Sequence, residues 1–211
     1  MHRFPTYLLD GYRRFMQGRF AREQERYQHL AEAGQRPRTM IIACCDSRAA
    51  PETVFDCGPG ELFVLRNVAN LVPRFEPDGG QHGTSAAIEF AVNNLKVENV
   101  VVMGHGRCGG IEAALSESRQ KAAGDFIGKW MSLLDPVIAR SGIPVDDDET
   151  HRLELERESV RNSLKNLRSF PYVAAREREG SLSLHGAWFD ISRGELWLLD
   201  PDTGDFARPG E

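Results

Sequence analysis

Three short apolar runs in the first half of the chain predict the strands of a buried sheet. Residues 40–43, 62–65 and 97–103 are runs of apolar β-formers, and the third has almost no alternation with polar residues, as expected for a strand buried on both faces. Between the second and third runs, a helix capped by Thr84 or Ser85 is predicted. Its apolar stripe consists of Ala87, Phe90, Ala91 and Leu95. Strand, helix and strand in this order favour a right-handed crossover in a parallel sheet.

The N-terminal part of the chain predicts helices that lack a core of their own. Apolar and aromatic residues fall at roughly helical spacing between positions 4 and 33, which indicates helices. Gly11 and Gly18 are expected to divide them into two or three pieces, and Gly34 and Pro37 to end them. So many aromatic residues require a surface to pack against, which either the chain's own core or another subunit provides.

The C-terminal half predicts further helices followed by a strand hairpin. One helix ends before Pro171 and carries an apolar stripe of Leu153, Val160, Leu164 and Leu167. Residues 182–191 and 195–199 are expected to pair as a hairpin through a turn at 192–194. The whole pattern predicts an α/β fold with a mainly parallel central β-sheet flanked by helices, an N-terminal helical arm and a C-terminal strand hairpin.

The length and composition favour one soluble domain. The 211 residues suit a single domain over 1–211, with a helical arm at 1–34 and an α/β core at 35–211. A net charge of -5 without a basic block argues against nucleic acid as a partner. No apolar run approaches the roughly 20 residues of a membrane span, and no signal-peptide core is evident, so we expect a cytoplasmic protein that binds no membrane. Four cysteines are then expected to be reduced, namely Cys44, Cys45, Cys57 and Cys108.

Chemically reactive residues follow two of the predicted strands. The sequence Ala-Cys-Cys-Asp-Ser-Arg occupies 43–48, and Gly-His-Gly-Arg-Cys-Gly occupies 104–109. If the two strands are parallel, both stretches lie at strand carboxyl ends, where open α/β sheets bind their ligands. Two thiols, an imidazole and a carboxylate would then meet in one crevice. Such a set of side chains is typical of a zinc site.

Cys44, His105 and Cys108 form the predicted zinc-binding set. The adjacent Cys45 is a poor fourth ligand, because neighbouring side chains of an extended backbone point in opposite directions. Three protein ligands and one open position are typical of a catalytic zinc, which lowers the pKa of bound water to about 7 and yields a hydroxide nucleophile. Two thiolate ligands weaken this effect, so we expect activity to rise on the alkaline side.

Asp46 and Arg48 are the predicted catalytic residues beside the metal. Asp46 can accept the proton of a zinc-bound hydroxide and direct its lone pair toward the substrate. Arg48 can hold Asp46 through a bidentate ion pair, which keeps the carboxylate ionised and oriented. Taken alone, the two residues could equally form an ordinary surface ion pair, and only their spacing from Cys44 favours the catalytic interpretation.

Two other interpretations of these residues stay open at this point. Gly104, Gly106 and Gly109 follow a strand with the spacing of a dinucleotide-binding motif, which would indicate a nicotinamide-dependent oxidoreductase. That motif requires a second strand that ends in an acidic residue about 20 positions later, and residues 121–130 do not predict one. The glycines more simply allow a tight turn around the ligands. The other alternative is a non-catalytic zinc-binding or redox module.

The same residues resemble the pattern of plant-like β-class carbonic anhydrases, in which Cys-x-Asp-Ser-Arg is followed some sixty residues later by His-x-x-Cys. The resemblance covers about residues 35–115 and includes Pro-Gly-Glu at 59–61, Arg-Asn-Val-Ala-Asn at 66–70 and Gly-Gly at 109–110. It implies reversible hydration of carbon dioxide to bicarbonate and a proton, by attack of zinc-bound hydroxide, with one Zn²⁺ ion per subunit. It also implies an α/β subunit that forms a homodimer or a multiple of dimers.

The resemblance further implies residues that bind the substrate. Gln35 matches a glutamine that donates a hydrogen bond to the substrate. Phe63 and Val68 match apolar positions of the carbon dioxide pocket, where dry walls favour a non-polar substrate. Gly109, directly after the last zinc cysteine, is the fourth expected substrate-binding residue. In the family, some of the pocket residues come from the neighbouring subunit.

Two positions depart from the family pattern. Phe90 occupies the place of a pocket tyrosine, so the hydroxyl group of that tyrosine is absent. Members with a second, inhibitory bicarbonate site carry tryptophan where this chain has Ile41. We therefore expect no such second site, and an open, water-bound zinc rather than one closed by Asp46.

Overall fold

The computed structural model describes residues 4–116, 124–146 and 148–210. The chain divides into two compact units, Met1–Arg36 and Pro37–Glu211. The boundary lies two residues beyond the end expected for the helical arm. All three predicted metal ligands belong to the second unit.

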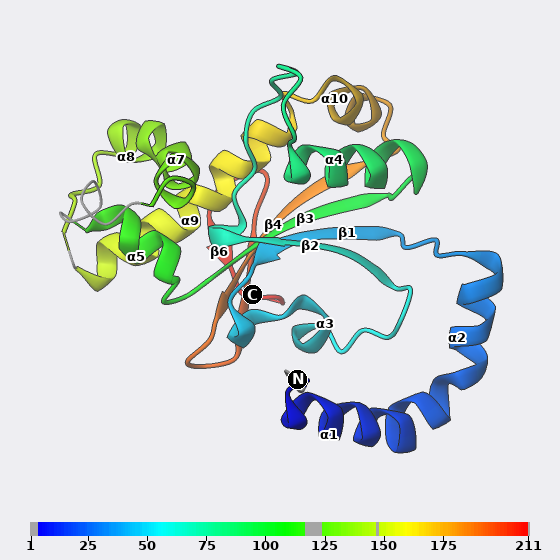
Figure 1. The fold of residues 1–211 in the computed structure, drawn as a ribbon. Helices are drawn as coiled ribbons and strands as arrows, with labels where there is room; N and C mark the ends of the chain where they lie inside the picture. The colour runs from blue at the N-terminus through cyan, green and yellow to red at the C-terminus, as the bar shows by residue number, and fades with distance from the viewer. Residues whose placement is uncertain (1–3, 117–123, 147, 211) are drawn as a thin grey trace. The chain divides into compact units, whose positions relative to one another are not determined.

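The first unit is a helical arm, drawn in blue in Figure 1. It consists of α1 (Thr6–Phe15), a π-helical segment (Met16–Phe20) and α2 (Ala21–Ala33). The prediction that Gly11 breaks the helix is wrong, because glycine lowers helix propensity by only about 1 kcal/mol and blocks no backbone hydrogen bond. Gly18 lies in the π-helical segment, where the helix is irregular. No side chain of the three segments is buried.

The second unit is built on a six-stranded sheet with the strand order β2-β1-β3-β4-β5-β6. The strands β2, β1, β3 and β4 run parallel, whereas β5 pairs antiparallel with both β4 and β6. Their bounds are Thr39–Cys44 for β1, Leu62–Asn67 for β2, Asn99–His105 for β3, Ser183–Asp190 for β4, Glu195–Leu199 for β5 and Phe206–Ala207 for β6. The mainly parallel sheet and the hairpin of β4 and β5 are confirmed, and the short β6 is an addition to the predicted strands.

Helices flank this sheet, as Figure 1 shows. Their bounds are Pro51–Val54 for α3, Gly83–Glu89 for α4, Gly109–Leu115 for α5, Ile127–Met131 for α7, Asp135–Ser141 for α8, Glu149–Leu167 for α9 and Pro171–Arg178 for α10. α9 contacts β3 and β4. Its residues Val160, Leu164 and Leu167 are buried in one core cluster with strand residues such as Met40 and Val102, so most of the predicted stripe of this helix is confirmed. Among the described helices, none is both long and apolar enough to span a bilayer.

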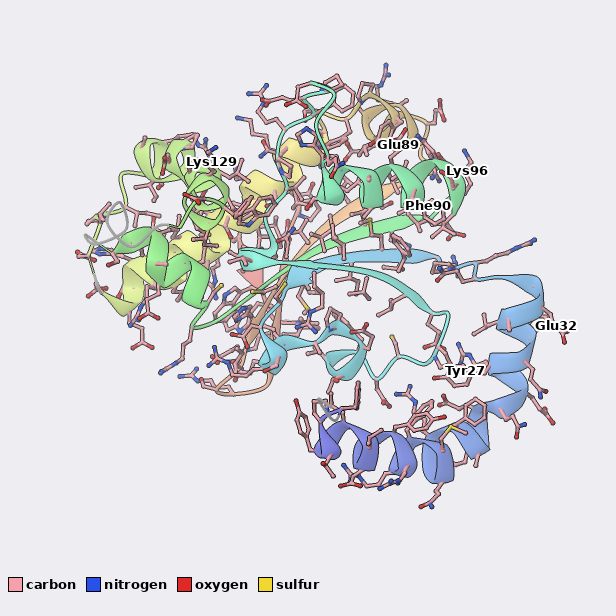
Figure 2. All side chains as sticks on the ribbon, viewed as in Figure 1. Tyr27, Glu32, Glu89, Phe90, Lys96 and Lys129 are labelled. Carbon is pink, nitrogen blue, oxygen red and sulfur yellow. The ribbon has the colours of Figure 1, made fainter. Side chains whose placement is uncertain are left out.

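Two details of the predicted crossover helix are wrong. α4 begins at Gly83 without a capping side chain, so neither Thr84 nor Ser85 acts as its cap. Phe90, which is labelled in Figure 2, is 45% exposed instead of buried in the apolar stripe. The reason is that α4 changes to a π-helical turn at this residue, where the regular helical period ends.

The strand register brings the reactive residues to one edge of the sheet. Cys44, the last residue of β1, pairs with Asn67 at the end of β2, and Ala43 pairs with Met103 of β3. His105, the last residue of β3, therefore lies one position beyond the level of Cys44. The two reactive stretches leave the sheet from neighbouring strands at the same edge, where parallel sheets bind ligands.

Candidate metal centre

Cys44, His105 and Cys108 lie close together at this edge of the sheet. Their donor atoms all lie within 4.8 Å of one another, and the Sγ atoms of the two cysteines are 4.0 Å apart. All three residues are buried, with no more than 6% of their surface exposed. Within the described part of the chain, no other group of three or more His, Cys, Asp or Glu side chains is arranged to hold a metal ion.

The imidazole of His105 is oriented for metal binding through Nε2. Its Nδ1 lies 2.9 Å from the carbonyl oxygen of Gly106. A carbonyl oxygen can only accept, so Nδ1 carries the proton and Nε2 keeps its lone pair. Nε2 is buried and has no hydrogen-bond partner among the residues that the structure describes. A buried lone pair without a donor fits a metal ligand whose second ring nitrogen is held by the backbone.

The two thiols are coupled to each other. The hydrogen bond between their Sγ atoms lowers the pKa of Cys44 and raises that of Cys108, so the pair shares one proton. The backbone N–H of Ala69 donates to the Sγ of Cys44 at 3.4 Å and favours its thiolate form. A metal ion that binds both sulfur atoms displaces the shared proton, because the thiolate is the ligand.

Asp46 and Arg48 form a bidentate ion pair beside the three donors. Nε of Arg48 donates to Oδ1 of Asp46 at 3.0 Å, and Nη2 donates to Oδ2 at 2.7 Å. These hydrogen bonds hold the pKa of Asp46 well below its usual range. Oδ2 also lies 3.9 Å from Nε2 of His105. An ionised and oriented carboxylate thus borders the point where the three donor atoms converge.

Arg66 holds the backbone of the first loop, a role that the sequence did not predict. Its Nε donates to the carbonyl oxygen of Cys44 at 2.8 Å, and its Nη2 donates to that of Asp46 at 2.6 Å. Arg66 lies on β2, next to β1 in the sheet. The only indication of this role in the sequence was that Arg66 belongs to the Arg-Asn-Val-Ala-Asn stretch, which is part of the family resemblance.

A buried acidic side chain from α9 contacts the second loop. Glu156 is only 3% exposed, and it accepts hydrogen bonds from the backbone N–H of Cys108 at 3.1 Å and from Nε1 of Trp188 at 3.0 Å. Burial raises the pKa of Glu156. The residue was not predicted, because it lies 48 positions from Cys108 among other charged residues of one helix.

Two of the predicted substrate-binding residues lie at the candidate metal centre. Val68 begins a 3₁₀ turn directly after β2 and packs, partly buried, against the core cluster that contains Cys44 and Cys108. Gly109 is the exposed first residue of α5, directly after Cys108. Both residues therefore border the three donors.

The other two predicted substrate-binding residues are placed differently. Phe63 pairs with Met40 in the strand register, about 13 Å along the strand from the level of Cys44. Its ring instead contacts that of Phe90, with centroids 5.8 Å apart, so within one chain Phe63 does not reach the three donors. Gln35 is exposed and belongs to the first unit. The substrate-binding roles of both residues stay predictions.

A sequence profile described as carbonic anhydrase matches residues 39–196, a span that includes both reactive loops. The chain belongs to the carbonic anhydrase family. It is 38% identical to β carbonic anhydrase 5, chloroplastic, of Arabidopsis thaliana over 183 residues, which are 83% of this chain and 59% of that relative. It is 34% identical to β carbonic anhydrase 6, mitochondrial, of the same plant over 201 residues, which are 92% of this chain and 67% of that relative.

These relatives are longer than this chain, and their names bear on its expected location. The chain spans less than two thirds of the length of the chloroplastic carbonic anhydrase, at 59%. The cytoplasmic location expected from the sequence is not confirmed, because the two plant relatives are named as chloroplastic and mitochondrial.

Solved structures of β-carbonic anhydrases share this fold. The β-carbonic anhydrase CcaA matches with a TM-score of 0.87 at 28% identity, over 98% of this chain and 92% of that one. A structure from work on two tetrameric β-carbonic anhydrases of the filamentous ascomycete Sordaria macrospora matches with a TM-score of 0.81 at 29% identity, over 96% of this chain and 98% of that one. The predicted α/β fold and the resemblance to β-class carbonic anhydrases are therefore confirmed.

The structure also argues against the dinucleotide-binding alternative. That motif requires a strand soon after the helix that follows its glycines. Among the described residues, the next strand after β3 is β4, which begins only at Ser183. Of the segment considered for the missing strand, residues 121–123 lie outside the described residues.

Proposed function

We propose that this member of the carbonic anhydrase family is itself a lyase that catalyses the reversible hydration of carbon dioxide with one Zn²⁺ ion. Carbon dioxide takes up hydroxide from water to form bicarbonate, and the remaining proton leaves to the solvent. The observation that carries the proposal is the convergence of Cys44, His105 and Cys108 beside the carboxylate of Asp46.

The donor set fits zinc. Cysteine thiolates and histidine imidazoles are preferred zinc ligands, and catalytic sites use three protein ligands. The Sγ separation of 4.0 Å is close to the roughly 3.8 Å expected for two sulfur atoms bound tetrahedrally at 2.3 Å from zinc. Cys45 is exposed, as expected for a cysteine outside the ligand set. When bound, the ion supplies a water molecule whose pKa is lowered toward 7.

Asp46 is the residue proposed to orient the attacking water molecule. Its ionised carboxylate accepts a hydrogen bond from that water and so directs a lone pair toward carbon dioxide. Arg48 fixes the carboxylate through both oxygen atoms and donates to the carbonyl oxygen of Arg107 at 3.1 Å. Because Arg48 engages both oxygens, Asp46 is held beside the metal ligands and does not act as a fourth one.

Four residues are proposed to bind carbon dioxide or bicarbonate. Val68 offers a dry apolar wall, which suits a non-polar substrate. Gly109 keeps space open, since an added Cβ there would meet no atom within 4 Å. Gln35 is proposed to donate a hydrogen bond to the substrate, as the family resemblance implies. Phe63 does not reach the donors of its own chain, so we assign it to the pocket of a neighbouring subunit.

We further propose that the chain forms a homodimer or a multiple of dimers. α1 has no buried residue and exposes several large apolar side chains, namely Tyr7, Leu8, Leu9 and Tyr12. Clustered apolar surface of this kind marks an interface, and one of the similar solved structures comes from tetrameric enzymes. Light scattering after size exclusion should give a mass of at least twice 23.6 kDa. A monomeric mass at every concentration tested would contradict this assembly.

Stopped-flow hydration of carbon dioxide, with zinc quantified in the same samples, tests the proposed activity. The parent protein should bind zinc and accelerate hydration. Cys108→Ser should lose both zinc and activity, whereas Asp46→Asn should keep zinc and lose activity by a factor on the order of 10²–10⁴. Cys45→Ser is the matched control, because Cys45 is exposed, and it should behave like the parent.

Two results would replace this proposal by an alternative. Parent rates equal to those of buffer, with stoichiometric zinc bound, would indicate a non-catalytic zinc-binding module. Binding of NADH without zinc would indicate a dehydrogenase.

A further inference from the structure

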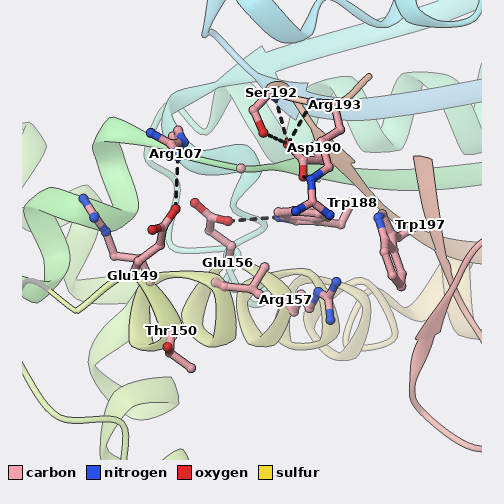
Figure 3. Close-up of a pocket in the computed structure, with 13 residues that line it drawn as sticks. Arg107, Glu149, Thr150, Glu156, Arg157, Trp188, Asp190, Ser192, Arg193 and Trp197 are labelled. Carbon is pink, nitrogen blue, oxygen red and sulfur yellow. Dashed lines mark hydrogen bonds and ion pairs between the residues drawn. The ribbon is translucent and has the colours of Figure 1, made fainter. Parts of the chain in front are cut away.

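The second ligand loop is held by one carboxylate. Both oxygen atoms of Glu156 accept a hydrogen bond from an N–H group: Oε1 from the backbone of Cys108 at 3.1 Å, and Oε2 from the indole of Trp188 at 3.0 Å. Glu156 lies on α9 and Trp188 on β4, so the carboxylate connects three segments that are far apart in the sequence. Figure 3 shows the bond between Glu156 and Trp188 in the lining of a cavity of about 550 Å³.

The backbone of this loop requires such support. Arg107 has a φ angle of 56°, a left-handed conformation that costs free energy in a residue with a side chain. Gly106 packs closely on the indole, since an added Cβ would lie 3.1 Å from Cζ2 of Trp188. Between the ligands His105 and Cys108, the backbone is thus strained at Arg107, and Gly106 packs tightly against Trp188.

Packing alone does not explain a carboxylate at position 156. A buried carboxylate is unfavourable unless hydrogen bonds satisfy its oxygen atoms, whereas an apolar side chain of similar size has no such requirement. One oxygen of Glu156 binds the backbone of a metal ligand, and the other is fixed by Trp188. Hydrogen bonds around a metal site orient the ligands and tune metal binding.

We propose that Glu156 is a positioning residue, which holds the backbone N–H of Cys108 and thereby fixes the direction in which the Sγ of Cys108 points. Trp188 fixes the carboxylate in turn. This inference rests on the proposed metal site, but it is independent of whether the bound metal hydrates carbon dioxide.

Glutamine is the sharpest replacement for Glu156, because its shape is nearly the same. Its amide has one oxygen that accepts and one nitrogen that only donates. Since the two partners of Glu156 are both N–H donors, Glu156→Gln must leave one of them facing another donor. The substitution therefore removes hydrogen bonding without removing volume.

Metal binding gives a direct test that does not depend on activity. Zinc affinity is measured by competition with a chelator, and Co²⁺ replaces zinc so that the visible and thiolate charge-transfer bands report the geometry of the sulfur ligands. Glu156→Gln should weaken zinc binding about 10- to 100-fold and shift the cobalt bands. Glu158→Gln is the matched control, since Glu158 lies on the same helix but pairs with Arg161, and it should match the parent.

A second substitution tests the hydrogen bonds themselves. Trp188→Phe removes the indole donor, so that a glutamine at 156 can turn its oxygen toward the N–H of Cys108. The loss of zinc affinity caused by Glu156→Gln should therefore be several-fold smaller in the Trp188→Phe background than in the parent. The comparison cancels the loss of packing that Trp188→Phe causes in both backgrounds.

The possible results separate the two proposals. If Glu156→Gln lowers the melting temperature but leaves zinc affinity and the cobalt bands unchanged, Glu156 is only structural and the inference is overturned. If the parent binds cobalt through its thiolates and shows the predicted dependence on Glu156, but does not hydrate carbon dioxide, only the proposed activity fails. A parent protein that takes up neither metal would overturn both.

Discussion

The first ligand loop, Cys44 to Arg48, is open to solvent beyond its buried first residue, whereas the second, Gly104 to Cys108, is almost entirely buried. Cys45, Ser47 and Arg48 are exposed in the first loop, and only Arg107 is exposed in the second. Arginine side chains hold the first loop: Arg48 binds Asp46, and Arg66 binds the backbone. Packing against α9 and β4 holds the second.

The difference indicates how each loop contributes to the metal centre. Substitutions in the first loop beyond the buried Cys44 should change the chemistry and leave the fold intact, because these side chains are not part of a core cluster. Substitutions in the buried loop should lower the stability of the fold together with metal binding. The chain thus places its oriented carboxylate on the accessible loop and two of its three proposed metal ligands on the buried one.

The largest expected effect comes from the ligand of the exposed loop. Cys44→Ser should abolish zinc binding and reduce carbon dioxide hydration by more than about a hundredfold. Substitution of a residue that only supports a metal ligand already lowers metal affinity or activity about 10- to 100-fold. Metal analysis and stopped-flow rates measure this loss. Cys45→Ser changes the neighbouring thiol, which is exposed, and should have no effect. Equal losses in both variants would show that the structure assigns the ligand wrongly.

A smaller loss of activity is expected from the ion pair of the same loop. Arg48→Lys keeps the positive charge but cannot donate to both oxygens of Asp46 in one plane. The hydration rate should fall roughly tenfold to a hundredfold, because Asp46 is less well oriented, while the melting temperature stays within the error of the parent. A large drop in melting temperature would mean that this loop is not independent of the fold.

Substitutions in the buried loop should instead lower the stability of the fold. A Cβ added at Gly104 would lie 2.8 Å from Cγ2 of Val160 on α9, so Gly104→Ala should lower the free energy of unfolding by about 1–3 kcal/mol. Gly109→Ala is the matched control, because its Cβ would meet no atom within 4 Å. Urea unfolding measures both. Equal stability of the two variants would contradict the tight packing of the second loop on α9.

The smallest effect concerns the exposed start of α9, the helix that carries Glu156. Nδ1 of His151 lies 2.7 Å from Oδ1 of Asp146, and this hydrogen bond raises the pKa of His151 above 6.5. A raised pKa in the folded state means that the pair stabilises the fold fully below about pH 6.5 and that its contribution fades as the pH rises through the raised value. An NMR titration should place the midpoint of His151 above 6.5, and Asp146→Asn should lower it. A midpoint at or below 6.5 in the parent would contradict the pairing.

The sequence predicted most of the sheet, and it singled out three donor side chains that the structure brings together, because both depend on local patterns. Apolar runs marked β1, β2 and β3, and residue type and strand position together indicated Cys44, His105 and Cys108. The register of parallel strands then brought these residues to one edge. The helical period was less reliable, since the π-helical turn at Phe90 exposes a side chain that the stripe had assigned to the core.

What the sequence could not predict depends on contacts between distant segments. Glu156 lies among other charged residues of α9, and only its burial and its bonds to Cys108 and Trp188 distinguish it. Arg66 acts across two paired strands, which requires their register. The strand register places Phe63 away from the three donors of its own chain. The pattern of apolar residues along the sequence does not show this distance.

X-ray absorption at the zinc edge tests the central claim most directly, because it counts the atoms around the metal. The parent protein, dialysed against metal-free buffer, should keep one zinc per chain with two sulfur neighbours at about 2.3 Å and two nitrogen or oxygen neighbours at about 2.0–2.1 Å. One of the lighter neighbours should be exchangeable for a small anion. A site with three or four sulfur neighbours, or a protein that retains no stoichiometric metal, would contradict the proposed centre.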